Sequence, residues 1–151
     1  MLPPSRAVSL AELAIDDEPP LTDAEKQARV IDLLRSRSGV YHTAAYETAT
    51  MKSARPERGS QPPGARFWYN NWDFNALCTI FEQTTGTRLF EEFERRLAAP
   101  LQMEDFRVQD GYYHREPQHS IHPAYPLRMS ARDMARFGLL YLRQGRWGEV
   151  Q

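Results

Sequence analysis

Apolar residues recur at helical spacing in several stretches of this chain, and the clearest stretch lies in its middle. Phe74, Leu77 and Phe81 are separated by three and four residues, which places their side chains on one face of a helix. Gly86 follows, and glycine commonly ends a helix because it tolerates the left-handed conformation. The pattern predicts a helix over about residues 72–85 with an apolar face that includes Cys78.

Three other stretches also predict helices. Thr22 and Glu25 have the spacing of a capping box, in which each side chain binds the other's backbone N–H, so a helix is expected to begin there and to stop before Ser38. Two more helices are expected over about residues 87–98 and 131–144. The side chains expected to face inward in these three helices are Ala28, Ile31 and Leu34, then Leu89, Phe93 and Leu97, then Met134, Phe137 and Tyr141.

Proline, glycine and polar residues dominate the remaining segments. Residues 1–21 resemble an extended lead-in, so the domain itself is expected to cover residues 22–151. Residues 40–66 and 104–128 have little periodicity and are predicted to be long loops, which often carry function when they occur inside compact domains. Convincing alternating strands are missing, and only short pieces such as residues 66–69 are candidates for pairing. The chain is therefore expected to be mostly helical.

Composition limits the classes of function. A chain of 151 residues with 41% hydrophobic and 11% aromatic content is typical of one globular domain. Its formal net charge of −1 predicts no general attraction to nucleic acid or to anionic membranes. No apolar run approaches the roughly 20 residues that cross a bilayer. The N-terminus shows no pattern of a secretory signal, and the location of the protein stays open.

A tyrosine and an asparagine stand two residues apart just before the predicted central helix. Tyr69 could act as a base at neutral pH only if nearby cations lowered its pKa from about 10. Asn71 could donate a hydrogen bond to a substrate carbonyl and accept one from an ammonium group. Such a pair suits acyl-transfer chemistry. The alternative is structural, with Asn70 or Asn71 serving only as the N-cap of the helix.

A cluster of histidines raises the question of a metal site. His114, His119 and His122 lie within nine residues, and three imidazoles can bind zinc. Their spacing matches no helix-borne pair of ligands, so hydrogen bonds within the loop are the preferred interpretation. Cys78 is the single cysteine, which excludes an internal disulfide and a zinc site built from several thiolates. No metal and no other cofactor is predicted.

Five segments, in order, resemble the serine β-lactamase and penicillin-binding-protein-like hydrolases. Residues 31–40 resemble the leucine-leucine…serine-glycine segment of that family, and residues 63–71 resemble its proline-glycine lead into a tyrosine-x-asparagine motif. Residues 84–86 (Thr-Thr-Gly) end a helix of the same type and place. Residues 99–105 resemble the family's proline-leucine-glycine-methionine turn, and residues 130–138 are similar to its serine-alanine-x-aspartate helix.

This resemblance implies an α+β fold, of which the present chain would be the helical lobe with long loops and little sheet. It also implies that Tyr69 is the proton-shuttling base and that Asn71 orients the substrate and a lysine. Complete family members use a serine nucleophile in an upstream serine-x-x-lysine motif and a lysine- or histidine-threonine-glycine-like strand downstream. The implied reaction is hydrolysis of a β-lactam, a D-amino-acid peptide or an ester through an acyl-serine.

The lysine of that motif has no counterpart in the 151 residues. The only lysines are Lys26 and Lys52, and Asp23 and Ala49 stand three residues before them. We therefore expect a partial domain, truncated at both ends, that is catalytically incompetent alone and exposes apolar surface. Two alternatives stay open: a non-catalytic module that binds a peptide or cell-wall fragment, and one half of a split enzyme. The substrate and the oligomeric state also stay open.

Overall fold

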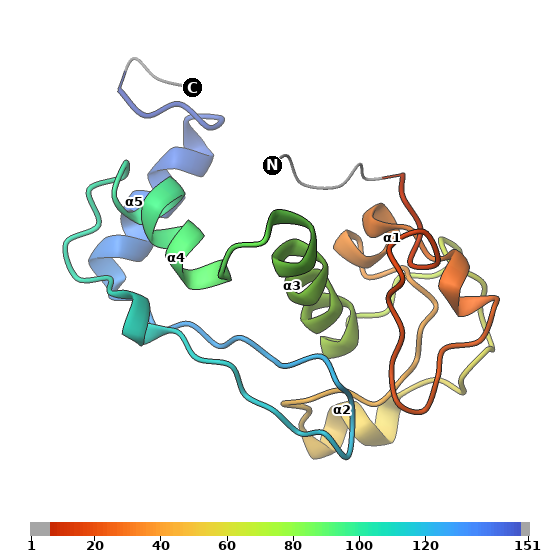
Figure 1. The fold of residues 1–151 in the computed structure, drawn as a ribbon. Coiled ribbons are helices and arrows are strands. Elements are labelled where there is room, and N and C mark those ends of the chain that lie inside the picture. The colour runs from red at the N-terminus through yellow and green to blue at the C-terminus, as the bar shows by residue number, and fades with distance from the viewer. Residues whose placement is uncertain (1–6, 149–151) are drawn as a thin grey trace. The chain divides into compact units, whose positions relative to one another are not determined.

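The computed structural model describes residues 7–148, which divide into two compact units (Figure 1). Unit 1 consists of residues 7–86 and Tyr113–Tyr125, and it carries η1, α1, α2 and α3. Unit 2 consists of Thr87–Tyr112 and of residues 126–148, and it carries α4, η2, η3 and α5.

Regular structure in residues 7–148 is helical, and backbone pairing there is limited to isolated bridges. This confirms the expectation of a mostly helical chain with little sheet. Residues 66–69 form no strand; the Trp68 amide donates a single hydrogen bond to the Ser36 carbonyl, with an N···O distance of 2.7 Å. None of the helices described is long and apolar enough to cross a membrane.

The central helix, α3 (Asn71–Thr85), confirms the predicted element almost to the residue. Asn70 is its N-cap, and Gly86 ends it in the left-handed conformation with φ of 69°. The buried face differs from the predicted face. Trp72, Ala76 and Ile80, spaced by four residues, are buried in the core of unit 1. The side chains expected on the buried stripe, Phe74, Leu77 and Phe81, are only partly buried, although Cys78 is buried.

The helix predicted from Thr22 to residue 37 is wrong. The capping box exists, because Thr22 and Glu25 exchange the expected hydrogen bonds. It opens only a 3-10 turn, η1 (Glu25–Gln27), and a separate short helix, α1 (Val30–Leu34), follows. Leu34, expected to face inward, is 50% exposed.

The N-terminal segment explains this break. The Leu10 amide donates to the Ala28 carbonyl at 2.8 Å, and the Val30 amide donates to the Val8 carbonyl at 3.0 Å. The Ala28 carbonyl and the Val30 amide therefore bind the N-terminal segment and not the helical partners that a helix running through residue 29 would require. Leu10, with Ile15 and Leu21, also packs in the core. Residues 8–21, expected as an extended lead-in, thus belong to the packing of unit 1.

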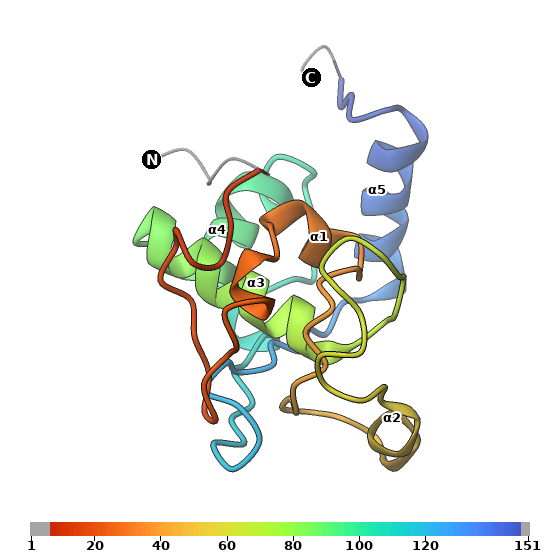
Figure 2. The same ribbon diagram turned by 90° about the vertical axis from the view of Figure 1, so that its right-hand side faces the viewer.

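The predicted loop over residues 40–66 contains a helix that the sequence analysis missed. Helix α2 (Ala49–Ala54) begins at Thr48, whose side chain accepts a hydrogen bond from the Met51 amide at 3.2 Å. It lies apart from α1 and α3 in both views (Figures 1 and 2). None of its residues is buried. A helix without a buried face needs no apolar stripe, and the sequence of α2 shows none.

Unit 2 begins with α4 (Leu89–Phe93), which continues as the π-helical turn η2 (Glu94–Ala98) and so matches the helix expected over residues 87–98. A 3-10 turn, η3 (Val108–Asp110), and helix α5 (Ala131–Leu142) follow. A small core forms where the rings of Phe93 and Phe106 meet edge to face, with centroids 4.9 Å apart. The buried members of this core are Ala98, Leu101, Met103 and Phe106.

Helix α5 has the predicted start but not the predicted buried face. Ser130 caps it, and Asp133 is the one residue of the helix that is fully buried. Met134 and Tyr141, expected inside, are 61% and 84% exposed. Helix α5 instead meets the rest of unit 2 through Asp133, which binds backbone amides of the preceding loop, and through Leu140, which packs against the small core.

Candidate active site

The start of α3 assigns the capping role to Asn70. Its side-chain oxygen accepts a hydrogen bond from the Asp73 amide at 2.8 Å, and its Nδ2 donates to the Trp68 carbonyl at 3.1 Å. Both ends of this buried amide therefore hold the chain where it changes from extended to helical. The neighbours Tyr69 and Asn71 are not needed for the cap.

Tyr69 is presented at the surface. Its side chain is 59% exposed, and its ring lies against Phe74 with centroids 5.3 Å apart. Within residues 7–148 no hydrogen-bond partner of the hydroxyl is described. The ring is thus supported on one side while the hydroxyl is available to a ligand.

Asn71 is anchored at one end of its amide only. Its Nδ2 donates to the Tyr46 carbonyl, with an N···O distance of 2.7 Å. For its Oδ1, the part of the chain that the structure describes shows no donor. Because the anchor fixes the amide plane, the oxygen is held in place while it stays free to accept a hydrogen bond.

The three histidines of the predicted cluster lie at two different places. His114 Nε2 and His119 Nδ1 both lie within hydrogen-bond distance of the Glu116 carboxylate, at 2.9 and 2.8 Å. These hydrogen bonds, from His114 first and His119 second, lower the pKa of Glu116 to about 2. The Tyr46 amide donates to the same carboxylate at 3.3 Å. The structure therefore connects this cluster to Asn71 through Tyr46.

His122 points elsewhere. It is buried, its Nδ1 lies 3.0 Å from Thr79 Oγ1, and its ring meets the Trp72 ring edge to face. Burial lowers the pKa of His122 below its usual value, which favours the neutral ring. No group of three histidine, cysteine, aspartate or glutamate side chains within residues 7–148 is arranged to hold a metal ion.

Behind the first turn of α3 lies a buried carboxyl group that the sequence analysis did not identify. Ser38 Oγ donates to Asp73 Oδ1 at 2.5 Å, whereas Asp73 Oδ2 has no hydrogen-bond partner. Burial raises the pKa of Asp73 to about 7. Ser38 itself is buried, and its oxygen also accepts from the Val40 amide at 3.0 Å. Ser38 therefore joins the Asp73 carboxyl group to the backbone at Val40.

A second buried carboxylate ties distant segments to α3. Asp17 Oδ2 accepts from Trp72 Nε1 and from Ser120 Oγ, both at 2.6 Å, and its Oδ1 accepts from the Ile121 amide at 2.8 Å. His42 Nδ1 lies 3.5 Å from the same carboxylate. These contacts fix the 113–125 segment against the helix. No local pattern in the sequence indicates these contacts, because the partners lie up to 104 residues apart.

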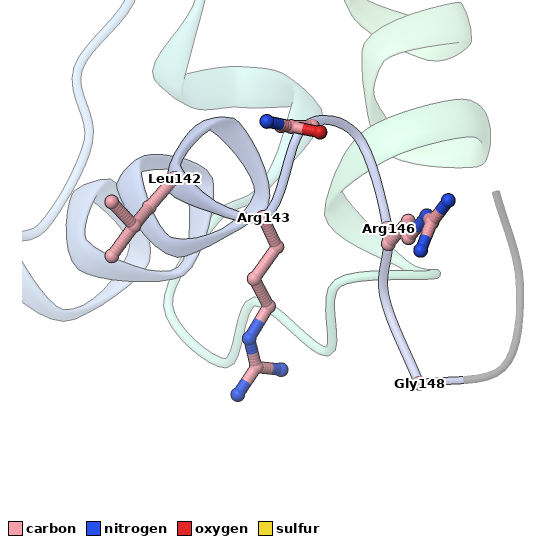
Figure 3. Close-up of a pocket in the computed structure, with 5 residues that line it drawn as sticks. Leu142, Arg143, Arg146 and Gly148 are labelled. Carbon is pink, nitrogen blue, oxygen red and sulfur yellow. The ribbon is translucent and has the colours of Figure 1, made fainter.

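A surface pocket of about 430 Å³ occurs in unit 2, at the end of α5. Figure 3 shows the guanidinium groups of Arg143 and Arg146 projecting from its lining in different directions. Leu142, Gln144 and Gly148 complete the lining. No carboxyl, imidazole or hydroxyl group occurs in the side chains of these five residues, so the pocket offers no acid or base for acyl transfer.

The mostly helical architecture of residues 7–148 is that of the helical part of the β-lactamase fold. The comparison with family models agrees, because the Beta-lactamase family model matches residues 7–149. The chain therefore belongs to the β-lactamase family of hydrolases. Among curated proteins, none is significantly similar to the chain.

Proposed function

We propose that Tyr69 and Asn71 form part of an acyl-transfer site for a β-lactam, a D-amino-acid peptide or an ester. The observation that carries this proposal is the state of the Asn71 amide, which is anchored to the Tyr46 carbonyl and has an open oxygen. The exposed Tyr69 side chain lies two residues before it, in the segment that precedes α3. A phenol can transfer a proton and an oriented amide can hold a substrate, and acyl transfer can use both groups.

In this reaction a serine oxygen would attack the acyl carbon while Tyr69, as the phenolate, takes the serine proton and passes it to the leaving group. Water would then attack the acyl-serine and lose a proton to the phenolate, which returns it to the serine oxygen as the acid is released. The oxygen of Asn71 would accept a hydrogen bond from a substrate N–H or from a lysine ammonium. Neither lysine of the chain follows a serine by three residues, so hydrolysis requires the serine–lysine pair from a segment outside these 151 residues.

The position of the lysines favours binding as the activity of these 151 residues alone. Lys26 forms an ion pair with Asp16, with its Nζ 2.5 Å from the carboxylate. Lys52 lies exposed on α2. Neither lysine is within hydrogen-bond distance of Tyr69 or Asn71 in the described contacts. The second candidate function is therefore a non-catalytic module that binds a peptide or cell-wall fragment through the same amide.

The test combines turnover and binding. We expect the chain to hydrolyse a chromogenic β-lactam or a p-nitrophenyl ester no faster than its Tyr69→Phe variant does. We also expect an N-acylated D-alanyl-D-alanine peptide to shift the NMR signals of the Tyr69 ring and the Asn71 side-chain amide. Turnover that Tyr69→Phe abolishes would show that the chain is itself an active hydrolase.

A matched control separates the site from a general effect on the helix. Asn71→Ala should weaken peptide binding at least about tenfold, because it removes the oriented amide. Gln83→Ala, on the same helix, removes an amide that also donates to a backbone carbonyl, that of Leu13 at 2.8 Å, and it should leave binding unchanged. Equal binding by the chain and its Asn71→Ala variant would overturn the proposed site.

A further inference from the structure

Asn71 is held in place by a relay of hydrogen bonds that ends at a carboxylate. Its Nδ2 donates to the Tyr46 carbonyl at 2.7 Å, and the Tyr46 amide donates to Glu116 Oε2 at 3.3 Å. We propose that Glu116 is a positioning residue for Asn71, acting through the backbone of Tyr46. This inference rests on the proposed function for the role of Asn71, but the relay itself can be tested without a ligand.

Tyr46 connects Glu116 to Asn71, and its backbone conformation indicates that surrounding residues hold it. Its φ is 67°, a left-handed value that residues other than glycine rarely adopt. Such a conformation persists only where surrounding contacts fix it. Three contacts do so here: Glu116 on the N–H, Asn71 on the carbonyl, and the His114 ring, whose centroid lies 5.2 Å from the tyrosine ring.

Glu116 is itself fixed by two imidazoles. His114 Nε2 lies 2.9 Å from Oε1, and His119 Nδ1 lies 2.8 Å from Oε2. The His119 amide also donates to the Glu116 carbonyl at 2.8 Å, which closes the turn around the carboxylate. His114 is paired through its backbone with Ala124. The carboxylate therefore has little freedom, and its position determines where the Tyr46 peptide lies.

The physical consequence is a rigid amide at the proposed site. Glu116 donates no proton and touches no part of Asn71. It holds the Tyr46 peptide, whose carbonyl then sets the plane of the Asn71 amide and the direction of its open oxygen. Loss of the carboxylate would release Tyr46 from the left-handed conformation and leave the Asn71 amide without its fixed acceptor.

The experiment measures the relay directly by NMR on the isotope-labelled chain. A scalar coupling across the hydrogen bond between Asn71 Nδ2 and the Tyr46 carbonyl carbon is expected in the unmodified chain. In Glu116→Ala the coupling should vanish, and the Asn71 side-chain protons should exchange with water at least about tenfold faster. Glu116→Gln keeps an oxygen that can accept from Tyr46, so the coupling should persist at reduced size.

Two controls separate positioning from a loss of fold. Glu57→Gln neutralises an exposed glutamate of unit 1 and should leave the coupling unchanged. The indole N–H signal of Trp72, bound to Asp17, should be the same in every variant if the core of unit 1 is intact. A coupling of full size in folded Glu116→Ala, or in Glu116→Gln if the alanine variant does not fold, would overturn the proposal.

Peptide binding then distinguishes the positioning proposal from the proposed function. If both hold, Glu116→Ala weakens binding of the N-acylated D-alanyl-D-alanine peptide as Asn71→Ala does. If the coupling is lost but binding is unchanged, Glu116 positions Asn71 and the proposed function of Asn71 fails. In Asn71→Ala the carboxyl signal of Glu116 should keep its low titration midpoint, because the histidines and not Asn71 hold the carboxylate.

Discussion

Helices α3 and α5 begin with the same local arrangement and end in different environments. Asn70 and Ser130 are their N-caps, and each accepts a hydrogen bond from the amide of an aspartate three residues later. Those aspartates, Asp73 and Asp133, are both fully buried. The two helix starts therefore share the spacing between cap and aspartate and the capping geometry.

The partners of the two carboxyl groups differ. Both oxygens of Asp133 accept hydrogen bonds from backbone amides, those of Glu104, Asp105 and Phe106, at 2.8 to 3.2 Å. Asp73 has the Ser38 hydroxyl on one oxygen and nothing on the other. Burial without full hydrogen bonding raises the pKa of Asp73 to about 7. The segment packed against each helix start therefore decides how many hydrogen bonds its buried aspartate receives.

The apolar faces differ as well. In α3, Trp72 and Ile80 are buried in the core of unit 1. In α5, Tyr141 and Leu142 are 84% and 78% exposed. The apolar spacing therefore predicted a helix in both cases, but α3 buries a face next to the predicted stripe, and α5 leaves Met134 and Tyr141 of its stripe exposed.

The largest expected effect is on the pH dependence of stability, through Asp73. Because its folded-state pKa of about 7 lies above the unfolded value of about 4, the folded state binds the proton more tightly. The stability that this proton contributes is fully present below pH about 4 and is lost as the pH rises to about 7. The loss is on the order of 4 kcal/mol at most.

Asp73→Asn should flatten this dependence, because the amide cannot ionise. The free energy of unfolding, measured in urea at pH about 4 and about 8, should fall with pH in the unmodified chain and much less in the variant. The change in the free energy of unfolding between the two pH values does not depend on any constant change in stability that the asparagine introduces. An identical slope in both proteins would show that Asp73 ionises normally.

Asp133→Ala should have the next largest effect on the free energy of unfolding. It leaves three backbone amides of the loop at residues 104–106 without their acceptor, so we expect a loss of about 3 kcal/mol. Hydrogen exchange of those three amides should become faster, which locates the effect. Asp133→Asn keeps one acceptor oxygen and should be affected less. Unchanged exchange at residues 104–106 would contradict the anchoring role.

The smallest expected effect comes from the exposed stripe of α5. Leu142→Gln should change the free energy of unfolding by less than about 0.5 kcal/mol, since the side chain is already 78% exposed. Ile80→Ala, in the buried face of α3, is the matched comparison and should cost about 2 to 5 kcal/mol. A large cost for Leu142→Gln would mean that this stripe is covered in solution.

Local signals in the sequence were sufficient for some elements and not for others. The apolar spacing and Gly86 predicted α3, because a helix is stabilised by contacts three and four residues apart. The capping box at Thr22 predicted a long helix that does not form, because residues 8–10 bind the backbone on both sides of Arg29. Helix α2 had no apolar stripe to predict it.

For the candidate site, the sequence determined which chemical groups are present: a phenol and an amide two residues apart, next to asparagine as a possible cap. Only the tertiary structure decided that Asn70 is the cap and that the amide of Asn71 is anchored by Tyr46. It also placed Glu116 behind Tyr46. The reason is the separation along the chain. Capping depends on residues within one turn, whereas Tyr46, which binds Asn71, and Glu116, which binds Tyr46, lie 25 and 45 positions from Asn71.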